Sequence, residues 1–544
     1  MRTSHSKILF LASLVLAAVV GGCHKKEGSL ALTPSGDLGA MIGSLAEVAR
    51  PEPVAVEGYG LVGGLAGKGS AYCPPEVRAY LKHYIATQLP NDRVNVDALI
   101  GGKDTAVVSL EAMIPATPLM GEHFDVRVAL LPGSEATSIQ GGWLYKAELV
   151  VQGTLGVDTR PLATVEGPVF INPIGTVEID PRSGYILGGG RTLYEYSASL
   201  RLRKPNYRVA GMIRNRLSER YGTGIAQAVS ASDIEVRIPA EYRRRKLRFV
   251  SMIPVTFLEV TDELTTTRIN TFVQQLAVSD AAAPLRAGKE SSEIALEAVG
   301  RESLTKLGAL VNASDAEVRL RAGRCMLSLG DDRGLAPLRD LAVDPKSPYR
   351  LDALEAIMVS AKRVDAVTLA GRLLRDDDVA VVLAAYDQLH RIDDRAVRRE
   401  VVGRSFLLEQ VVQSSHKAIF VSRSGDPRVV LLGAPLTCRD SLFVESPDQE
   451  LVLDSRAGQG YVSVIRKHRT RPGVIGPIRS KPDLADLVRT LGNEPSASPP
   501  GQVQSLGVPY SQVIALLERL SAKEGVAAAF WAGPLPKIGV PVKK

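Results

Sequence analysis

The 544-residue sequence predicts an α+β fold that is interrupted by an all-α block of helical repeats. Residues 54–278 mix strand-like alternation of apolar and polar residues with amphipathic helical patterns. Near Ala283 the pattern changes to short helices that recur about every 31 residues, and strand-like runs return from about Phe406. The predicted parts are a signal peptide (1–22), a lipid-anchored linker (23–53), an α+β region (54–280), a helical-repeat block (283–404) and a C-terminal α+β region (405–544) that ends in two helices.

The N-terminus has the features of an export signal. Ile8–Val20 is an apolar run of thirteen residues, shorter than the roughly 20 that cross a bilayer but suited to a signal-peptide core. It ends in Val20-Gly21-Gly22-Cys23, which resembles a bacterial lipobox; an ordinary signal peptide with an incidental cysteine is the alternative. We therefore expect Cys23 to be the lipidated mature N-terminus. His24 after it favours the outer membrane, by resemblance to such lipoproteins.

The segment GYGLVGGLAGKGS, from Gly58 to Ser70, has a glycine at nearly every second or third position. Its first three glycines satisfy the G-x-G-x-x-G pattern of dinucleotide-binding folds, but that pattern needs a helix to begin at the third. The three glycines that follow argue against a helix, because each costs about 0.5–1 kcal/mol relative to alanine. A P-loop also fits poorly, since Gly69 stands where a Ser or Thr would bind Mg²⁺.

We therefore interpret this segment as a glycine-rich structural loop that binds no nucleotide cofactor. Glycine has no Cβ, so another backbone can approach it closely. The segment is thus a candidate assembly loop, whose glycines are Gly58, Gly60, Gly63, Gly64, Gly67 and Gly69.

The α+β region contains several elements with clear boundaries. Pro75 opens a helix through Leu89, and strands are predicted over Ala106–Ala112 and Phe124–Val128. A second helix begins after the N-cap residue Asn206 and ends before Gly222. The last strand, Ile234–Ile238, alternates strictly and stops at a proline.

An internal repeat defines the helical block. Leu307, Leu338 and Leu369 recur every 31 residues, and Ala322, Ala353 and Ala385 recur in a second helix. The segments VRLRAGRCMLSLG and VVLAAYDQLHRI resemble HEAT-like repeats, and a plain helical bundle is the alternative. We expect a separable module in which Cys325 is a buried small residue. The run Asp376-Asp377-Asp378 suits a helix N-terminus better than a metal site.

The C-terminal region returns to mixed structure. Strands are predicted over Ala418–Val421 and Val429–Leu432, and helices over Pro482–Leu491 and Pro509–Glu524. The segment Ser496–Gly501 between the two helices is predicted to be a loop.

No set of residues predicts catalysis. The seven histidines include no His-x-x-x-His pair, and neither a Cys-x-x-Cys nor a G-x-S-x-G motif is present. The sequence therefore predicts a non-enzymatic protein without metal or other cofactor. With Cys23 acylated, at most one disulfide can form among Cys73, Cys325 and Cys438, and the sequence leaves open whether Cys73 pairs with Cys438.

The charge is modest for the length, with 66 Lys and Arg against 59 Asp and Glu. A net charge of +7 does not favour nucleic acid as a partner. Two basic clusters stand out, Arg243-Arg244-Arg245-Lys246 and Arg466-Lys467-His468-Arg469 with Arg471. Such runs are usually solvated loops, and facing an anionic partner is the alternative.

The order of these features resembles the flagellar P-ring protein family. The match rests on the glycine segment, the helix after it, the strand Ala106–Ala112, the strand FDVRV, the stretch ATSIQGGWLYKAEL and the stretch YGTGIAQAVSASDIEVRIP. It covers about 190 residues before the repeat block and, more loosely, the last 130. The chain departs from the family's pattern at Cys23, at Lys68-Gly69-Ser70 and in the helical block.

The resemblance implies a periplasmic structural subunit that forms a homo-oligomeric ring around the flagellar rod, beside an outer-membrane ring. By this resemblance its partners are further copies of itself, rod and outer-membrane ring proteins, and peptidoglycan, with the lipid as membrane contact. The alternative is a lipid-anchored scaffold or binding module of another envelope machine, acting through its helical repeats.

Overall fold

A computed structural model describes residues 38–88, 95–154, 159–175, 179–278, 286–467, 474–495 and 504–538. The predicted signal peptide, Cys23 and residues 23–37 of the linker lie outside the described residues, as does the predicted loop Ser496–Gly501. The chain forms two compact units. One contains the residues up to Pro51 together with Tyr196–Asp394, and the other contains Glu52–Glu195 together with Arg395–Lys544.

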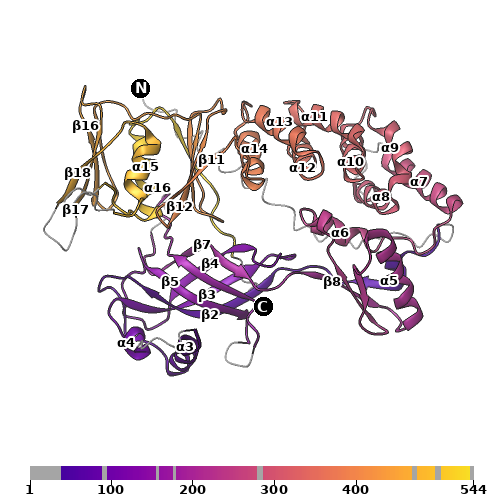
Figure 1. The fold of residues 1–544 in the computed structure, drawn as a ribbon, viewed down its shortest axis with the longest axis horizontal. Coiled ribbons are helices and arrows are strands. Elements are labelled where there is room, and N and C mark those ends of the chain that lie inside the picture. The colour runs from indigo at the N-terminus through magenta and orange to yellow at the C-terminus, as the bar shows by residue number, and fades with distance from the viewer. Residues whose placement is uncertain are drawn as a thin grey trace, which may run out of the picture. The chain divides into compact units, whose positions relative to one another are not determined.

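The predicted α+β region is divided between the two units, and the fold class is confirmed as mixed α and β with a helical block. In the second unit, six antiparallel strands close into a barrel in the order β2-β3-β4-β7-β6-β5 (Figure 1). The strands are β2 (Val54–Gly63), β3 (Thr105–Ile114), β4 (His123–Leu130), β5 (Trp143–Val151), β6 (Ala163–Pro168) and β7 (Ser183–Thr192).

Two helices, α3 (Pro75–Gln88) and α4 (Val96–Ile100), pack on the outside of this barrel. Leu81 of α3 and Ile100 of α4 are buried against Leu61 and Val107, the outward-facing residues of β2 and β3. The predicted helix from Pro75 is therefore confirmed, and it covers one part of the outer wall.

The C-terminal part of this unit is built from two sheets with two helices between them (Figure 1). The larger sheet has the order β11-β12-β14-β13-β19, and the smaller one has the order β15-β16-β17-β18. The elements are β11 (Arg398–Val402), β12 (Phe406–Val411), β13 (Ala418–Val421), β14 (Arg428–Leu432), β15 (Leu442–Glu445), β16 (Leu451–Ser455), β17 (Val462–Lys467), β18 (Val474–Ser480), α15 (Leu484–Gly492), α16 (Tyr510–Ala522) and β19 (Ala529–Ala532).

The first unit begins with a four-stranded antiparallel sheet in the order β1-β8-β10-β9. Its apolar face packs against α5, which Asn206 caps through hydrogen bonds from the backbone N–H groups of Arg208 and Val209. Gly222 ends this helix at φ +116°, as predicted. The elements are α2 (Ile42–Leu45), β1 (Ala46–Val48), β8 (Ser197–Leu202), α5 (Tyr207–Tyr221), β9 (Ala226–Ala228), β10 (Asp233–Arg237), α6 (Lys246–Met252) and α7 (Asp262–Ala277).

The described end of the predicted linker, residues 38–53, is folded and contains the short strand β1. β1 pairs antiparallel with β8, so residues 46–48 are part of the sheet. The buried Arg268 donates a hydrogen bond of 2.8 Å from Nε to the carbonyl of Leu38 and lies over the ring of Phe257.

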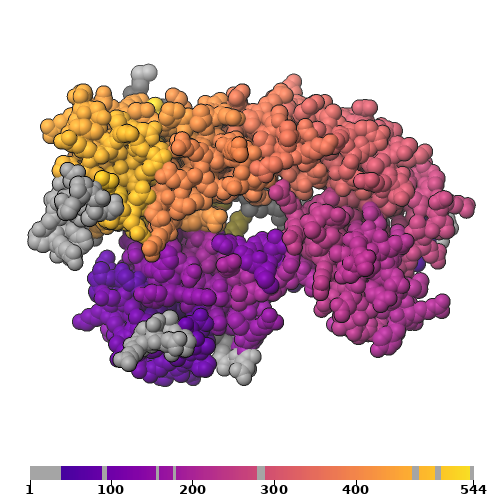
Figure 2. Space-filling view, viewed as in Figure 1, coloured from indigo at the N-terminus to yellow at the C-terminus, as the bar shows by residue number. Residues whose placement is uncertain are grey.

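The helical block follows as three successive helix pairs after α8, and Figure 2 shows it as a continuous packed surface. Leu307, Leu338 and Leu369 are buried in the first helix of each pair, and Ala322, Ala353 and Ala385 in the second, as the 31-residue spacing predicts. The helices are α8 (Arg286–Val299), α9 (Leu304–Leu310), α10 (Ala316–Ser328), α11 (Leu335–Val343), α12 (Arg350–Ser360), α13 (Arg363–Leu373) and α14 (Val379–Arg391).

Local contacts explain the ends of this block. The carboxylate of Asp378 accepts a hydrogen bond from the N–H of Ala380 and so caps α14, while Asp376 pairs with the buried Arg350. The prediction of a capping role for the aspartate run is confirmed for Asp378. The block ends at Arg391 rather than 404, because β11 already belongs to the C-terminal sheet.

The start of the helical block, from α8 to α10, shares its core with the sheet and helix α5, which argues against the expectation of a separable module. Ile213 of α5, Phe249 of α6, Leu296 of α8 and Met326 of α10 belong to one cluster of buried side chains. Separating the block would expose this shared apolar surface to water.

Two buried carboxylates link the helices around this shared core. Glu293 and Glu297 of α8 are fully buried. Arg248 of α6 bridges the two, at 2.8 Å from Glu297 and 2.9 Å from Glu293. Glu297 also accepts from Arg245 at 2.9 Å. From α10, Arg324 lies 2.6 Å from Glu293.

The same ion pairs involve one residue of the first basic cluster, Arg243-Arg244-Arg245-Lys246. Arg243 and Arg244 are exposed, whereas Arg245 forms an internal ion pair with Glu297.

Burial alone would raise the pKa of Glu293, but the guanidinium groups of Arg248 and Arg324 hold this pKa at about 2. An unpaired ion at this depth would be strongly destabilising, so the three arginines Arg245, Arg248 and Arg324 and the two glutamates depend on one another.

We expect Glu293→Gln to lower the free energy of unfolding at pH 7 by about 3–5 kcal/mol, because buried guanidinium groups lose their carboxylate. The folded-state pKa of Glu293 lies below the ordinary value of 4.5. Its stabilising contribution is therefore complete above that pH and is lost as the pH falls toward 2. Denaturant titrations at pH 7 and at about pH 3 should show a smaller acid-induced loss in the variant than in the wild type. The exposed Glu241→Gln is the matched control, and equal losses in all three proteins would contradict this account.

Candidate assembly surface

The glycine segment is a strand followed by a turn, and not a loop throughout. Gly58 and Gly60 lie in β2, where their missing side chains would point into the barrel. A Cβ at Gly58 would lie 2.3 Å from the carbonyl oxygen of Glu148, and one at Gly60 would lie 2.8 Å from Leu144. At Gly58 a backbone therefore approaches closely inside the barrel, between β2 and β5.

Gly63 has a different neighbour, on the outside of the barrel. A Cβ there would lie 2.5 Å from the Tyr145 hydroxyl and 2.7 Å from a ring carbon. Trp143 is the residue paired with Gly63 across β2 and β5. Trp143 is 40% exposed and Tyr145 is 46% exposed. The absence of a side chain at Gly63 thus leaves room for the ring of Tyr145, which remains partly open to solvent.

The turn after β2 contains the remaining glycines. Gly64 and Gly67 have φ of +78° and +84°, and a Cβ at either would meet nothing within 4 Å. The N–H of Gly67 donates to the carboxylate of Asp104 at 2.7 Å. Gly69 is tightly enclosed, because a Cβ there would lie 2.2 Å from the carbonyl oxygen of Thr105. An assembly role for these glycines remains a prediction, and Gly64 and Gly67 are the ones open to a partner.

The carboxylate of Asp125 joins the barrel to the C-terminal part of the same unit. Asp125 of β4 accepts hydrogen bonds from the N–H groups of Gly188 at 2.7 Å and Gly425 at 2.9 Å. Burial raises the pKa of Asp125, and the two N–H donors oppose that shift. Beside this joint, the ring of Phe170 packs on that of Tyr510, with centroids 5.8 Å apart. The barrel and the two-sheet part are therefore held by both polar and aromatic contacts.

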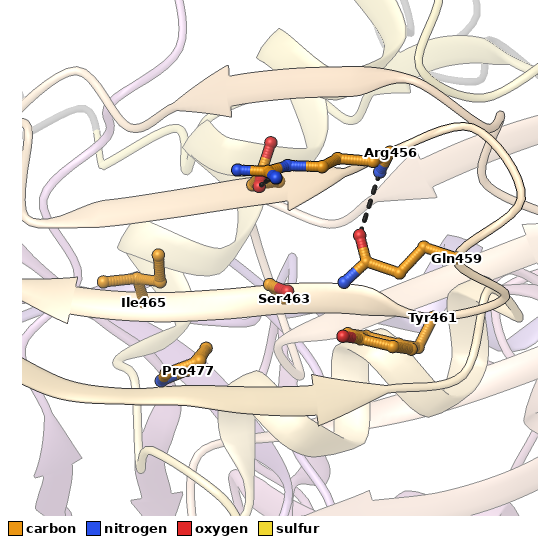
Figure 3. Close-up of a pocket in the computed structure, with 7 residues that line it drawn as sticks. Arg456, Gln459, Tyr461, Ser463, Ile465 and Pro477 are labelled. Atoms are coloured by element: carbon orange, nitrogen blue, oxygen red, sulfur yellow. Dashed lines mark hydrogen bonds and ion pairs between the residues drawn. The ribbon is translucent and has the colours of Figure 1, made fainter.

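The outer face of the smaller sheet carries a shallow groove of about 440 Å³ that is lined by both polar and apolar side chains (Figure 3). The backbone N–H of Arg456 donates to the side chain of Gln459 at 3.1 Å, and the Arg456 guanidinium lies 3.9 Å from Asp454. Its lining residues are Asp454, Arg456, Gln459, Tyr461, Ser463, Ile465 and Pro477. The groove brings together no histidine, cysteine or paired carboxylates, so its residues supply no acid–base pair or nucleophile–base pair.

The other basic cluster lies at the end of β17. Arg466 donates to the carbonyl of Leu506 at 2.9 Å, and Lys467 pairs with Glu445 at 3.3 Å. His468, Arg469 and Arg471 lie outside the described residues.

Among the described residues, no group of three or more His, Cys, Asp or Glu side chains is placed to hold a metal ion. In the same residues Cys73, Cys325 and Cys438 are free thiols, so Cys73 does not pair with Cys438. Cys325 is fully buried, as predicted, and burial raises its pKa well above the ordinary value. No helix within the described ranges is both long enough and apolar enough to span a bilayer.

We expect Gly58→Ala to destabilise the barrel by several kcal/mol, because the new methyl group would overlap a backbone carbonyl that cannot rotate away. Gly211→Ala in α5 is the matched control, since a Cβ there meets nothing within 4 Å and alanine favours a helix. Thermal unfolding followed by circular dichroism measures both. Similar melting temperatures for the two variants would show that barrel closure does not require the glycine.

The family model described as "Flagellar P-ring protein" matches residues 41–271. A flagellar P-ring protein of Wolinella succinogenes is 30% identical over 194 residues, which are 34% of this chain and 52% of that protein. One of Hydrogenovibrio crunogenus is 27% identical over 227 residues, covering 38% of this chain and 58% of the relative. One of Anaeromyxobacter sp. is 27% identical over 235 residues, covering 40% and 60%.

The chain spans a little over half the length of these curated relatives. The match begins just before α2 and ends within α7. It therefore contains the whole barrel, the four-stranded sheet and helices α5 and α6. The helical block and the C-terminal two-sheet part lie outside it. Residues 41–271 are thus similar in sequence to the flagellar P-ring protein family, and the resemblance predicted from the glycine segment and the strands after it is confirmed for this part of the chain.

Proposed function

We propose that this chain is a non-enzymatic structural subunit of a periplasmic ring, similar to the flagellar basal-body P-ring that surrounds the rod at the peptidoglycan layer. The observation that carries the proposal is the family match over residues 41–271. That range contains the whole closed barrel and the whole four-stranded sheet with helices α5 and α6. The proposed partners are further copies of the chain, rod and outer-membrane ring proteins, and peptidoglycan.

We further propose that the chain is tethered to the outer membrane through a lipid on Cys23. The short apolar run and the small residues before the cysteine support this. Two or more acyl chains hold a protein stably at a membrane, whereas one is marginal. The lipid would place the ring subunit on the periplasmic side of that membrane.

A second candidate function is a lipid-anchored scaffold or binding module of another envelope machine. The helical block favours it, because three helix pairs at a 31-residue period suit HEAT-like repeats, and stacked repeats offer an extended binding surface. The two functions differ in whether the chain encircles a rod or only carries a partner on its repeats.

Electron microscopy of the full chain purified in detergent distinguishes these functions. The ring proposal predicts closed rings of many copies, with the barrel and the sheet-and-helix part in the ring wall. Particles that stay single at all concentrations, with and without isolated rod, would contradict it and favour the scaffold.

Cys23→Ser should release the chain from the envelope, because it removes the acceptor of the lipid. Fractionation of cells is expected to show wild type with the outer membrane and the variant in the soluble periplasmic fraction. Cys73→Ser is the matched control, since Cys73 is a half-buried thiol of the folded part. A variant that is processed and still sediments with membranes would contradict the lipid anchor.

A further inference from the structure

Opposite charges are separated along the matched region. Residues 52–195, which form the barrel and its helices, contain ten Lys and Arg against sixteen Asp and Glu, a formal charge of −6. Residues 196–260, which form most of the sheet-and-helix part, contain thirteen against five, a formal charge of +8. The chain's modest net charge of +7 conceals this separation.

Part of the positive charge is neutralised inside the fold. Arg245 and Arg248 pair with buried glutamates, while Arg216 and Arg220 donate to the carbonyls of Phe257 and Ala298. These arginines are explained by the packing of the unit.

The cations at the start of α5 are not explained in this way. Arg203, Lys204 and Arg208 are exposed, and they make no ion pair with any residue that the structure describes. Tyr207 among them is 78% exposed. Positive charge at a helix N-terminus is unfavourable because it meets the positive end of the helix dipole, and α5 has no acidic residue in its first turn. We call these four residues the basic surface.

The barrel carries a surface of complementary chemistry on the outside of β5 and β6. Trp143 and Tyr145 are half-exposed aromatic residues, and Trp and Tyr are enriched among residues that dominate binding interfaces. Glu148 and Glu166 flank them on the same two strands and make no ion pair with a described residue. Lys146 is the one cation between them on β5. We call Trp143, Tyr145, Glu148 and Glu166 the aromatic–acidic surface.

We propose that the basic surface of one copy of this chain docks on the aromatic–acidic surface of the next copy. Carboxylates pair with Arg and Lys, and aromatic rings attract guanidinium and ammonium groups over their faces. The two surfaces are different patches of one sequence, so the contact is heterologous and repeats from copy to copy until the assembly closes. This inference rests on the proposed ring function and names the faces that would form its subunit contact.

Charge reversal on the full chain in detergent tests the contact. Lys204→Glu/Arg208→Glu and Glu148→Lys/Glu166→Lys should each raise the dissociation constant for self-association by about a hundredfold or more, because like charges across an interface cost several kcal/mol. A mixture of the two variants should recover association, since each then offers a surface that the other complements. Mass photometry and sedimentation velocity measure all of these states, and circular dichroism verifies that each variant is folded.

Lys306→Glu/Arg372→Glu, an equal charge change at exposed positions of the helical block, is the matched control and should assemble as wild type. Wild-type association should also weaken with rising salt. If wild type forms rings and both surface variants form them equally well, the contact is refuted while the ring function stands. If wild type never associates, both are refuted. Loss of binding to anionic vesicles by the Lys204→Glu/Arg208→Glu variant, with self-association unchanged, would assign the basic surface to a membrane and overturn the proposal.

Discussion

The fold of the first unit depends on two buried carboxylates that must be paired with arginine side chains. Glu293 and Glu297 are buried in α8, and they hold α6 on one side and α10 on the other through arginine side chains. Because an unpaired buried ion is so costly, none of these helices can move away without exposing or stranding a charge. The last helices of the family-matched region and the first helices of the repeat block are therefore one body, which makes the block an extension of the matched fold.

A second constraint acts in the barrel, where space is the limiting quantity. Six strands close the barrel, and Gly58 and Gly60 let β2 approach β5 where any side chain would collide. Outside the same strands, Gly63 leaves room for Tyr145. The glycine-rich strand β2 thus packs closely against β5 inside the barrel and leaves room for the Tyr145 ring of β5 on the outside. This arrangement links the folding of the barrel to the surface proposed for assembly.

Local signals in the sequence predicted the elements well and their long-range contacts poorly. Helix α5 was predictable because Asn206 and Gly222 mark its ends, and the repeat helices because their leucines recur at a fixed spacing. Barrel closure was not predictable, since it depends on strands such as β2 and β5 that are distant in the sequence. The glycines of β2 suggest a loop in the sequence, because what requires them is the close packing of the neighbouring strand β5. The sequence contains one sign of the buried ion pairs, which is two glutamates four residues apart among the apolar residues of α8. Their role becomes clear only from the positions of Arg248 and Arg324 in the fold.

The family-matched part of the first unit and the start of the helical block should unfold as one body, because they share one core and its buried ion pairs. Hydrogen–deuterium exchange of the full chain under increasing denaturant tests it most directly, because cooperative units reveal themselves by a shared opening free energy. Amides of α5, α6, α8 and α10 are expected to converge on the same opening free energy. Opening of α8 and α10 at a clearly lower free energy, with α5 and α6 still protected, would contradict it.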